Sequence, residues 1–304
     1  MAAMHEGQVH IDADIARETI AEQFPEYRFE PIIPIASIGT DNAIFRVGSG
    51  VSARFPLRPM AASIYAEKLG REVAAMEELA VHCAVATPRP IAIGSPGPLF
   101  PMPWSLQSWI EGNVATHESH AASDTFALGL ANLIASMRAV DTRGRRFDRP
   151  GRGGHLPDHD AWMSTCFDKS RDLLDVDRLS NLWGRLRELP RFGADLMNHG
   201  DLIPANLLVR GEQLIGILDC GGFGPADPAL DLVAGWHLLD RDRREILRAR
   251  LGADDVEWQR GAAWAFQQAM GLVWYYRLTN PAMSALGRST LDRILEDGEI
   301  GSSS

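Results

Sequence analysis

Two short aliphatic runs, each with an isolated acidic residue, constrain this chain more than any other part of its sequence. The first is HGDLIPANLLV at residues 199–209, where a histidine, an aspartate and an asparagine precede a β-forming stretch. The second is ILDCGGFG at residues 217–224, where Asp219 closes an aliphatic run. The short GEQ turn between the runs indicates a β-hairpin. The pattern therefore predicts two adjoining strands with polar side chains gathered at their ends.

These polar residues suit the transfer of a phosphoryl group. Such a transfer needs a carboxylate beside the attacking hydroxyl, hard oxygen ligands for Mg²⁺ and a cation on the phosphates. Asp201 and Asn206 are five residues apart, which matches the H-x-D-x-x-x-x-N spacing of kinase-type catalytic loops. Asp219 stands where the metal-binding aspartate of a D-x-G motif belongs, and Pro204 restricts the loop backbone. Each element alone is common in ordinary turns, but the joint pattern favours phosphoryl transfer.

The chain resembles the aminoglycoside/choline-kinase-type phosphotransferases, which share the protein-kinase-like fold. The resemblance lies first in HGDLIPAN and in DCGGFGPADPALDL at residues 219–232, and these two motifs are specific to the superfamily. It extends to IASIGTDNAIFRVG (35–48), SARFP (52–56), PWSLQSWIEG (103–112) and GRGG (151–154). WQRGAAWAF and YYRLTNP, near the C-terminus, are similar to the antibiotic branch rather than to choline kinases.

The texture of the sequence changes near residue 110. Before it, a helical pattern at about residues 12–23 is followed by short β-like pieces punctuated by glycines, which surround a second helical pattern at residues 63–83 and suit an antiparallel sheet. After it, helical spacing dominates, and the two opening runs are the only strand-like texture. With the resemblance, this predicts an α+β, protein-kinase-like two-lobe fold. A small antiparallel-sheet N-terminal lobe at residues 1–108 would bind nucleotide. A larger, mainly helical C-terminal lobe at residues 109–304 would hold the catalytic loop and the substrate site.

The resemblance implies a role for each polar residue of the two motifs. Asp201 would be the catalytic base that accepts or orients the acceptor hydroxyl, and Asn206 and Asp219 would ligate Mg²⁺. His199 would hold the loop through hydrogen bonds to backbone around the D-x-G turn.

It also implies which residues meet the phosphates. Arg54 in SARFP takes the place of the phosphate-binding lysine of protein kinases, and its guanidinium suits phosphate and carboxylate alike. The following helix offers Glu72 as its partner, with Glu67 as a competitor. The alternative for this pair is a purely structural salt bridge.

The remaining nucleotide contacts are expected in two loops. The phosphate-covering loop would be SIGTDN at residues 37–42, where Ser37 and Thr40 assist the backbone N–H groups. The connector from Gln107 to Trp109 would meet the adenine edge through its backbone, and the ring of Trp109 is more typical of packing.

Five further residues of the motifs are not expected to carry the proton or the metal. Many relatives have His, Gly and Phe at the places of Ile203, Ala205 and Cys220, but none of these positions carries the proton or the metal. We expect Cys220 to be a buried, small hydrophobic residue. Asp227 and Asp231 suit capping of the helix that follows.

The amino-acid composition limits the kinds of partner that the protein is expected to bind. Lys and Arg total 30 against 40 Asp and Glu, and the formal charge of −10 disfavours nucleic acid as a partner. No run approaches 18 apolar residues and no signal peptide is recognisable, so we expect a cytoplasmic protein without a membrane partner. The three cysteines form no C-x-x-C pair that would indicate zinc or disulfides. We expect a monomer or a weak dimer.

The sequence thus predicts an ATP- or GTP-dependent phosphotransferase that acts with Mg²⁺ on a hydroxyl of a small molecule. The acceptor stays open. The acidic charge suits a polycationic aminoglycoside, whereas the aromatic residues between Trp258 and Tyr276 suit an apolar, macrolide-like acceptor or form a core stripe. A nucleotide-binding pseudokinase-like module is the alternative, and the presence of Asp201, Asn206 and Asp219 argues against it. Protein-kinase activity is disfavoured because no A-P-E segment follows Asp219.

Overall fold

A computed structural model describes residues 9–35 and 42–301 of the chain. The described residues form two units. Unit 1 contains those up to Val81, together with Ala86–Glu111 and Ile217–Gly221, and unit 2 contains His82–Val85, Gly112–Gly216 and the residues from Gly222 onward. The boundary expected from the sequence lies after residue 108, with the five residues around Asp219 in the helical lobe.

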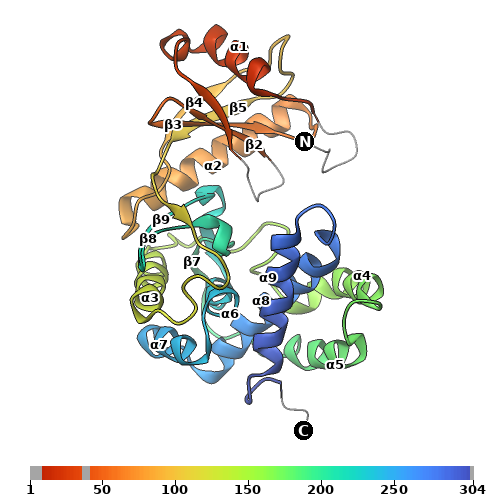
Figure 1. The fold of residues 1–304 in the computed structure, drawn as a ribbon. Coiled ribbons are helices and arrows are strands. Elements are labelled where there is room, and N and C mark those ends of the chain that lie inside the picture. The colour runs from red at the N-terminus through yellow and green to blue at the C-terminus, as the bar shows by residue number, and fades with distance from the viewer. Residues whose placement is uncertain (1–8, 36–41, 302–304) are drawn as a thin grey trace. The chain divides into compact units, whose positions relative to one another are not determined.

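Unit 1 is built on an antiparallel sheet with the strand order β1-β2-β3-β5-β4 (Figure 1). Its strands are β1 (Ile32–Ile35), β2 (Asn42–Val47), β3 (Val51–Pro56), β4 (Pro90–Gly94) and β5 (Trp104–Ser108). The rings of Phe55 in β3 and Trp104 in β5 stack with centroids 4.7 Å apart and are fully buried. This aromatic core fixes β3, the strand that carries Arg54.

Two helices pack on this sheet, α1 (Ala13–Gln23) and α2 (Ala62–His82), with a short 3₁₀ turn η1 (Pro25–Tyr27) after the first. In α2 the apolar residues Tyr65, Leu69, Met76 and Leu79 recur at helical spacing and are buried. Because this stripe is buried, it fixes the orientation of α2 on the sheet and, with it, the position of Glu72.

Unit 2 is mainly helical, as predicted. Its helices are α3 (Asp124–Arg138), α4 (Asp160–Ser170), α5 (Val176–Leu186), α6 (Val233–Leu238), α7 (Arg241–Leu251), α8 (Asp255–Tyr275) and α9 (Pro281–Leu295). Figure 1 shows α8 between α6 on one side and α4 and α5 on the other. Trp258 and Trp264 of α8 are 1% and 0% exposed, so these aromatic residues belong to the core and not to a binding surface.

Short strands bracket the opening motifs. The predicted hairpin is formed by β8 (Leu207–Arg210) and β9 (Gln213–Ile217), and β6 (Asn113–Val114) pairs with β8. A separate antiparallel pair joins β7 (Leu196–Asn198) to β10 (Gly224–Ala226), with Asn198 opposite Gly224. The sequence analysis missed β6, β7 and β10, because strands of two or three residues are too short to show an alternating pattern. The β7–β10 pair fixes the backbone immediately before His199.

A buried ion pair ties α8 to the segment after β10. Asp227 Oδ2 accepts hydrogen bonds from Arg260 Nε at 3.1 Å and Trp264 Nε1 at 2.8 Å, and Arg260 Nη2 makes a second contact with the same oxygen. The two charged side chains are only 3% and 5% exposed. Asp227 Oδ1 also accepts the N–H of Ala229 at 3.1 Å. Asp227 therefore has a structural role, as the sequence analysis expected.

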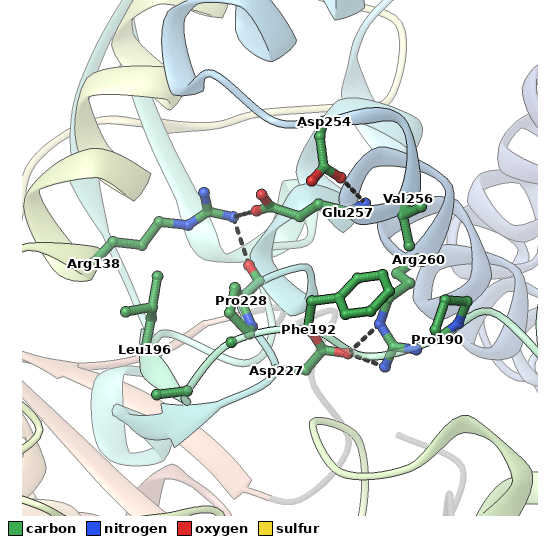
Figure 2. A pocket seen from close by; sticks show the side chains of 12 residues that line it. Arg138, Pro190, Phe192, Leu196, Asp227, Pro228, Asp254, Val256, Glu257 and Arg260 are labelled. Atoms are coloured by element: carbon green, nitrogen blue, oxygen red, sulfur yellow. Dashed lines mark hydrogen bonds and ion pairs between the residues drawn. The ribbon is translucent and has the colours of Figure 1, made fainter.

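Figure 2 shows a hollow of about 300 Å³ beside this ion pair, between residues 190–196, the end of α3 and the first turn of α8. Its polar groups pair with one another. Arg138 Nη2 donates to Glu257 Oε1 at 2.7 Å and to the Pro228 carbonyl at 2.5 Å, and Asp254 Oδ1 accepts the N–H of Glu257 at 2.8 Å. None of the residues predicted for catalysis lines it, so we assign this hollow to the packing between helices.

Replacing Arg260 by Leu is expected to lower the free energy of unfolding by about 3–5 kcal/mol, because Asp227 would keep a buried charge without its partner. Urea unfolding followed by circular dichroism measures this. Arg277→Leu, at an exposed position just beyond α8, is the control and is expected to change stability by less than about 0.5 kcal/mol. A loss below about 1 kcal/mol for Arg260→Leu would show that the pair does not anchor α8.

No helix in the described ranges has both the length and the hydropathy that a membrane span requires.

Candidate active site

The catalytic loop of unit 2 occupies residues 199–206, between β7 and β8, and ends in the 3₁₀ turn η3 (Pro204–Asn206). Gly200 has φ = 84°, in the left-handed region that glycine adopts without strain. The Asp201 carbonyl accepts the N–H of Ile203 at 2.9 Å and Asn206 Nδ2 at 2.9 Å. These bonds close the loop on itself, and the restricted backbone of Pro204 maintains that closed shape.

The Asp201 carboxylate is 36% exposed and is held mainly through one of its oxygens. Oδ1 accepts hydrogen bonds from Arg152 Nη2 at 2.7 Å and from Gln268 Nε2 at 2.9 Å. Oδ2 accepts one longer bond, from Asn206 Nδ2 at 3.2 Å. Sequence reasoning missed Arg152 and Gln268, although Arg152 stands in the GRGG stretch that supported the resemblance.

Asp231 holds the backbone of the catalytic loop. Its two carboxylate oxygens accept the N–H groups of His199 at 2.7 Å and Gly200 at 2.9 Å. Burial raises the pKa of Asp231, while the charge of His199 and the two amide hydrogen bonds act in the opposite direction. This corrects the expected capping role, since the turn η5 (Leu230–Leu232) has no side-chain cap. His199 Nδ1 itself accepts the N–H of Asp201 at 3.3 Å.

Gln268 is in turn anchored by a buried histidine. Its Oε1 lies 3.0 Å from His237 Nε2, and His237 Nδ1 lies 2.8 Å from Thr290 Oγ1. Burial lowers the pKa of His237 to about 4, so its ring is neutral near pH 7. Because Gln268 donates to Asp201 through Nε2, its Oε1 is the acceptor and His237 Nε2 carries the proton. The chain of contacts therefore orients the amide that holds Asp201.

In unit 1, the D-x-G aspartate pairs with the arginine of β3. Arg54 Nη2 lies 2.8 Å from Asp219 Oδ1, and the two side chains are 18% and 53% exposed. Burial acts to lower the pKa of Arg54, but the charge and hydrogen bond of Asp219 outweigh it and raise that pKa. Asp219 has φ = 57°, a left-handed conformation that is uncommon outside glycine and often marks functional positions.

Glu72 lies next to this pair but has another partner. Its Oε1 is 3.6 Å from Lys68 Nζ, one turn earlier on α2, and the side chain packs on Gly221, where a Cβ would come within 2.7 Å of Glu72 Cγ. Burial raises the pKa of Glu72, and the charges of Lys68 and Arg54 oppose that shift. The observed ion pair of Arg54 with Asp219 thus differs from the expected one with Glu72, and the competitor Glu67 is exposed.

The connector is tied into the sheet of unit 1. Gln107 is 7% exposed in β5, and its carbonyl accepts Ser52 Oγ at 3.4 Å. The N–H of Trp109 donates to the Gly50 carbonyl at 2.8 Å, and the Arg46 guanidinium lies 5.0 Å from its ring centroid. Trp109 can therefore offer its carbonyl, and not its N–H, to a nucleotide base. Ser37 and Thr40 lie outside the described residues.

Asn206 and Asp219, each within its own unit, carry oxygen atoms of the kind that magnesium prefers. Asn206 donates to Asp201 through Nδ2, and its amide Oδ1 is a hard oxygen of the kind that magnesium takes as a ligand. Asp219 offers a carboxylate that is more than half exposed. In the described part of the chain, no group of three His, Cys, Asp or Glu residues could hold a metal ion.

The three departures from the family pattern leave the polar contacts intact. Ile203 is 7% exposed and joins the loop through its backbone, and Cys220 is 1% exposed, as expected for a small hydrophobic residue. Ala205 lies within η3, where no side-chain contact is needed.

Comparisons with known proteins show which structures resemble this one. No curated protein sequence matches the chain significantly. The GDP complex of wild-type aminoglycoside 2′-phosphotransferase-IIIa has a similar structure, with a TM-score of 0.68, 18% identity, and coverage of 93% of this chain and 98% of that one. Macrolide 2′-phosphotransferase MphH from Brachybacterium faecium has a TM-score of 0.61 and 18% identity, with coverage of 92% of this chain and 98% of that one. ADP-bound aminoglycoside phosphotransferase APH(2″)-Ib has a TM-score of 0.59 and 14% identity, with the same two coverages.

These similarities confirm the predicted protein-kinase-like fold, because each covers nearly the whole chain. The sequence itself matches the model of the phosphotransferase enzyme family, APH, over residues 32–264. That span is well over half of the 304 residues and includes both opening motifs. The chain therefore belongs to the phosphotransferase enzyme family.

Proposed function

We propose that this protein transfers the γ-phosphoryl group of ATP or GTP to a hydroxyl of a small molecule. The observation that carries the proposal is the state of the Asp201 carboxylate. It is partly exposed, its Oδ1 is fixed by two donors, and its Oδ2 accepts only one long hydrogen bond within the described residues. A carboxylate held in this way can receive a proton from a bound hydroxyl without moving.

The proposed step balances as a single displacement. The acceptor oxygen forms a bond to the γ-phosphorus while the bond from phosphorus to the nucleoside diphosphate breaks. The hydroxyl proton passes to Asp201 Oδ2, which is the oxygen with the weaker existing contact. Asn206 closes the loop that aims this oxygen, and Asp231 fixes the backbone on the other side of it.

The remaining site residues are proposed on their chemistry. Mg²⁺, when bound, would neutralise charge on the phosphates, and Asn206 and Asp219 would supply protein oxygens to it. Arg54 would contact phosphate, and the nearby charge of Glu72 would help to keep its guanidinium protonated by raising its pKa. Adenine or guanine would meet backbone at Gln107 and Trp109, and the phosphate-covering role of Ser37 and Thr40 is proposed from the sequence alone.

The broader assignments remain part of this proposal. Residues 1–108 would serve as the nucleotide-binding lobe and 109–304 as the lobe for the acceptor. Solved neighbours named as aminoglycoside and macrolide phosphotransferases support an antibiotic acceptor of either kind, and their GDP and ADP complexes support either nucleotide. A cytoplasmic monomer or weak dimer without a nucleic-acid partner is proposed from composition. The alternative is a pseudokinase-like module that binds nucleotide without transfer.

A thermal-shift titration tests nucleotide use. With ATP or GTP at about 100 times its Kd and Mg²⁺ present, binding is expected to stabilise the folded protein by about 2.7 kcal/mol and to raise Tm. The rise should be larger with Mg²⁺ than with EDTA. If neither nucleotide raises Tm in the presence of Mg²⁺, the proposed function is wrong.

A further inference from the structure

The catalytic loop has no lysine or arginine between Asp201 and Asn206. Between Asp201 and Asn206 the sequence is Leu-Ile-Pro-Ala, so the loop brings no positive charge to the place where the acceptor hydroxyl must meet the phosphoryl group. Negative charge spreads over the oxygens of that group in the transition state, and a fixed cation there contributes strongly to the rate. In unit 2, a cation beside Asp201 has to come from another segment of the chain.

Arg152 lies beside Asp201. It comes from the loop before α4, 49 residues away from Asp201 in the sequence, and its Nη2 lies 2.7 Å from Asp201 Oδ1. The same nitrogen lies 3.4 Å from the Gly200 carbonyl. Within the described residues, both hydrogen bonds of Arg152 use Nη2, and its side chain is 21% exposed. The N–H groups on Nε and Nη1 therefore remain able to bind an anion.

Arg152 is held by a backbone that has little freedom. The next residue, Gly153, has φ = 117°, which side chains rarely allow, and a Cβ there would come within 2.8 Å of Ala226 Cβ. The Gly153 carbonyl accepts the N–H of Asp227 at 2.8 Å. These contacts join the loop to β10 and to the buried ion pair of Asp227. The guanidinium is thus preorganised, as a cation that stabilises a transition state must be.

Arg152 is not required to hold Asp201 in place. Gln268 already donates to the same oxygen at 2.9 Å, and Gln268 is anchored by the buried His237. A neutral amide therefore already anchors Asp201, and Arg152 adds a positive charge whose Nε and Nη1 make no hydrogen bond within the described residues.

We propose that Arg152 is a catalytic residue that binds the oxygens of the transferring phosphoryl group through Nε and Nη1. Nη2 would stay on Asp201, so that one guanidinium spans the base and the group under attack. This inference rests on the proposed function. It adds no covalent step, because the acceptor oxygen still bonds to the γ-phosphorus, the nucleoside diphosphate still leaves, and Asp201 still takes the proton.

The test compares Arg152→Gln with Arg146→Gln, which removes an equal charge from an exposed position in the same loop. The readouts are nucleoside diphosphate formation from ATP and from GTP with Mg²⁺ in the presence of aminoglycoside, macrolide, choline-like amine and sugar acceptors, and the Tm shift that each nucleotide causes. We expect Arg152→Gln to lower kcat by roughly 100-fold to 1,000-fold with the Tm shift retained. Arg146→Gln should behave like the unaltered protein. Arg152→Lys should recover part of the loss, and added guanidinium should restore turnover to Arg152→Ala.

A double replacement separates this role from one exerted through Asp201. If Arg152 binds the phosphoryl group, Arg152→Gln will lower the residual turnover of Asp201→Asn by roughly a further tenfold. If it only positions Asp201, the second replacement will have no further effect, and the inference is overturned. It is equally overturned if Arg152→Gln alone keeps kcat within about threefold. Absence of any Mg²⁺-dependent turnover in the unaltered protein would instead refute the proposed function, and with it this inference.

Discussion

Replacing Asp201 by Asn is expected to lower kcat by about 100-fold to 10,000-fold while nucleotide binding stays nearly unchanged. Asn keeps the size of the side chain and can still accept hydrogen bonds from Arg152 and Gln268 through its Oδ1, so the loop should keep its shape. What it loses is the oxygen that accepts the hydroxyl proton. Steady-state kinetics with ATP and GTP, together with the Tm shift that each nucleotide causes, measure both properties.

Asp172→Asn is the matched control, because Asp172 is an exposed aspartate of the same unit that lies between α4 and α5. It should leave kcat and Tm as they are. Should Asp201→Asn retain a kcat within about threefold of the unaltered protein, Asp201 would not be the base.

Replacing Asp219 by Asn is expected to lower kcat at least 100-fold at low Mg²⁺, since changing even the outer contacts of a metal site costs about 10- to 100-fold. Asn keeps one oxygen but loses the charge that attracts the cation. The half-saturating Mg²⁺ concentration should therefore rise, and part of the activity should return at high Mg²⁺. A magnesium titration of turnover at saturating nucleotide gives this shift directly.

Arg54→Gln controls for the ion pair that the Asp219 replacement also removes. It breaks the same contact from the other side but leaves the carboxylate in place. We expect it to raise the KM for nucleotide without moving the half-saturating Mg²⁺ concentration. If Asp219→Asn and Arg54→Gln give the same profile, with no change in Mg²⁺ dependence for either, Asp219 acts only as the partner of Arg54.

The loops of the site could be predicted from the sequence, because their chemistry requires particular residue types at short, fixed spacings. Asp201, Asn206 and Asp219 could be found by their distances along the chain, and the hairpin between them by its turn. The helical character of unit 2 followed from the spacing of its apolar residues as well, α8 (Asp255–Tyr275) included. Local patterns of this kind are encoded within a few consecutive residues.

The side chains around Asp201 could not be found in this way. Arg152 and Gln268 are 49 and 67 residues from Asp201, and neither belongs to a motif with fixed spacing. Asp231 was recognised but given a local capping role, whereas its carboxylate reaches back more than 30 residues to the loop amides of His199 and Gly200. Contacts of this range depend on the tertiary fold, which a single sequence pattern does not specify.

The partner of Arg54 illustrates the same limit at one position. Sequence reasoning offered Glu72 because of its place on the following helix. In the structure Glu72 is close enough to act on Arg54 through its charge, but Lys68 lies one turn away on the same helix and takes the ion pair. The left-handed backbone of Asp219 was not predicted either. Asp is one of the few non-glycine residues that tolerate this conformation, but nothing in the sequence requires it at this position.

The most direct test of the central claim is to identify a phosphorylated acceptor. The unaltered protein would be incubated with Mg²⁺, ATP or GTP, and a panel of aminoglycosides, macrolides, choline-like amines and sugars, and each acceptor would be analysed by mass spectrometry. Phosphotransfer predicts that at least one acceptor gains the mass of a single HPO₃ group in step with nucleotide consumption, and that Asp201→Asn slows this gain by about 100-fold or more. If nucleotide binds with Mg²⁺ but no acceptor gains that mass and no nucleotide is consumed, the protein is a binding module and phosphotransfer is not its function.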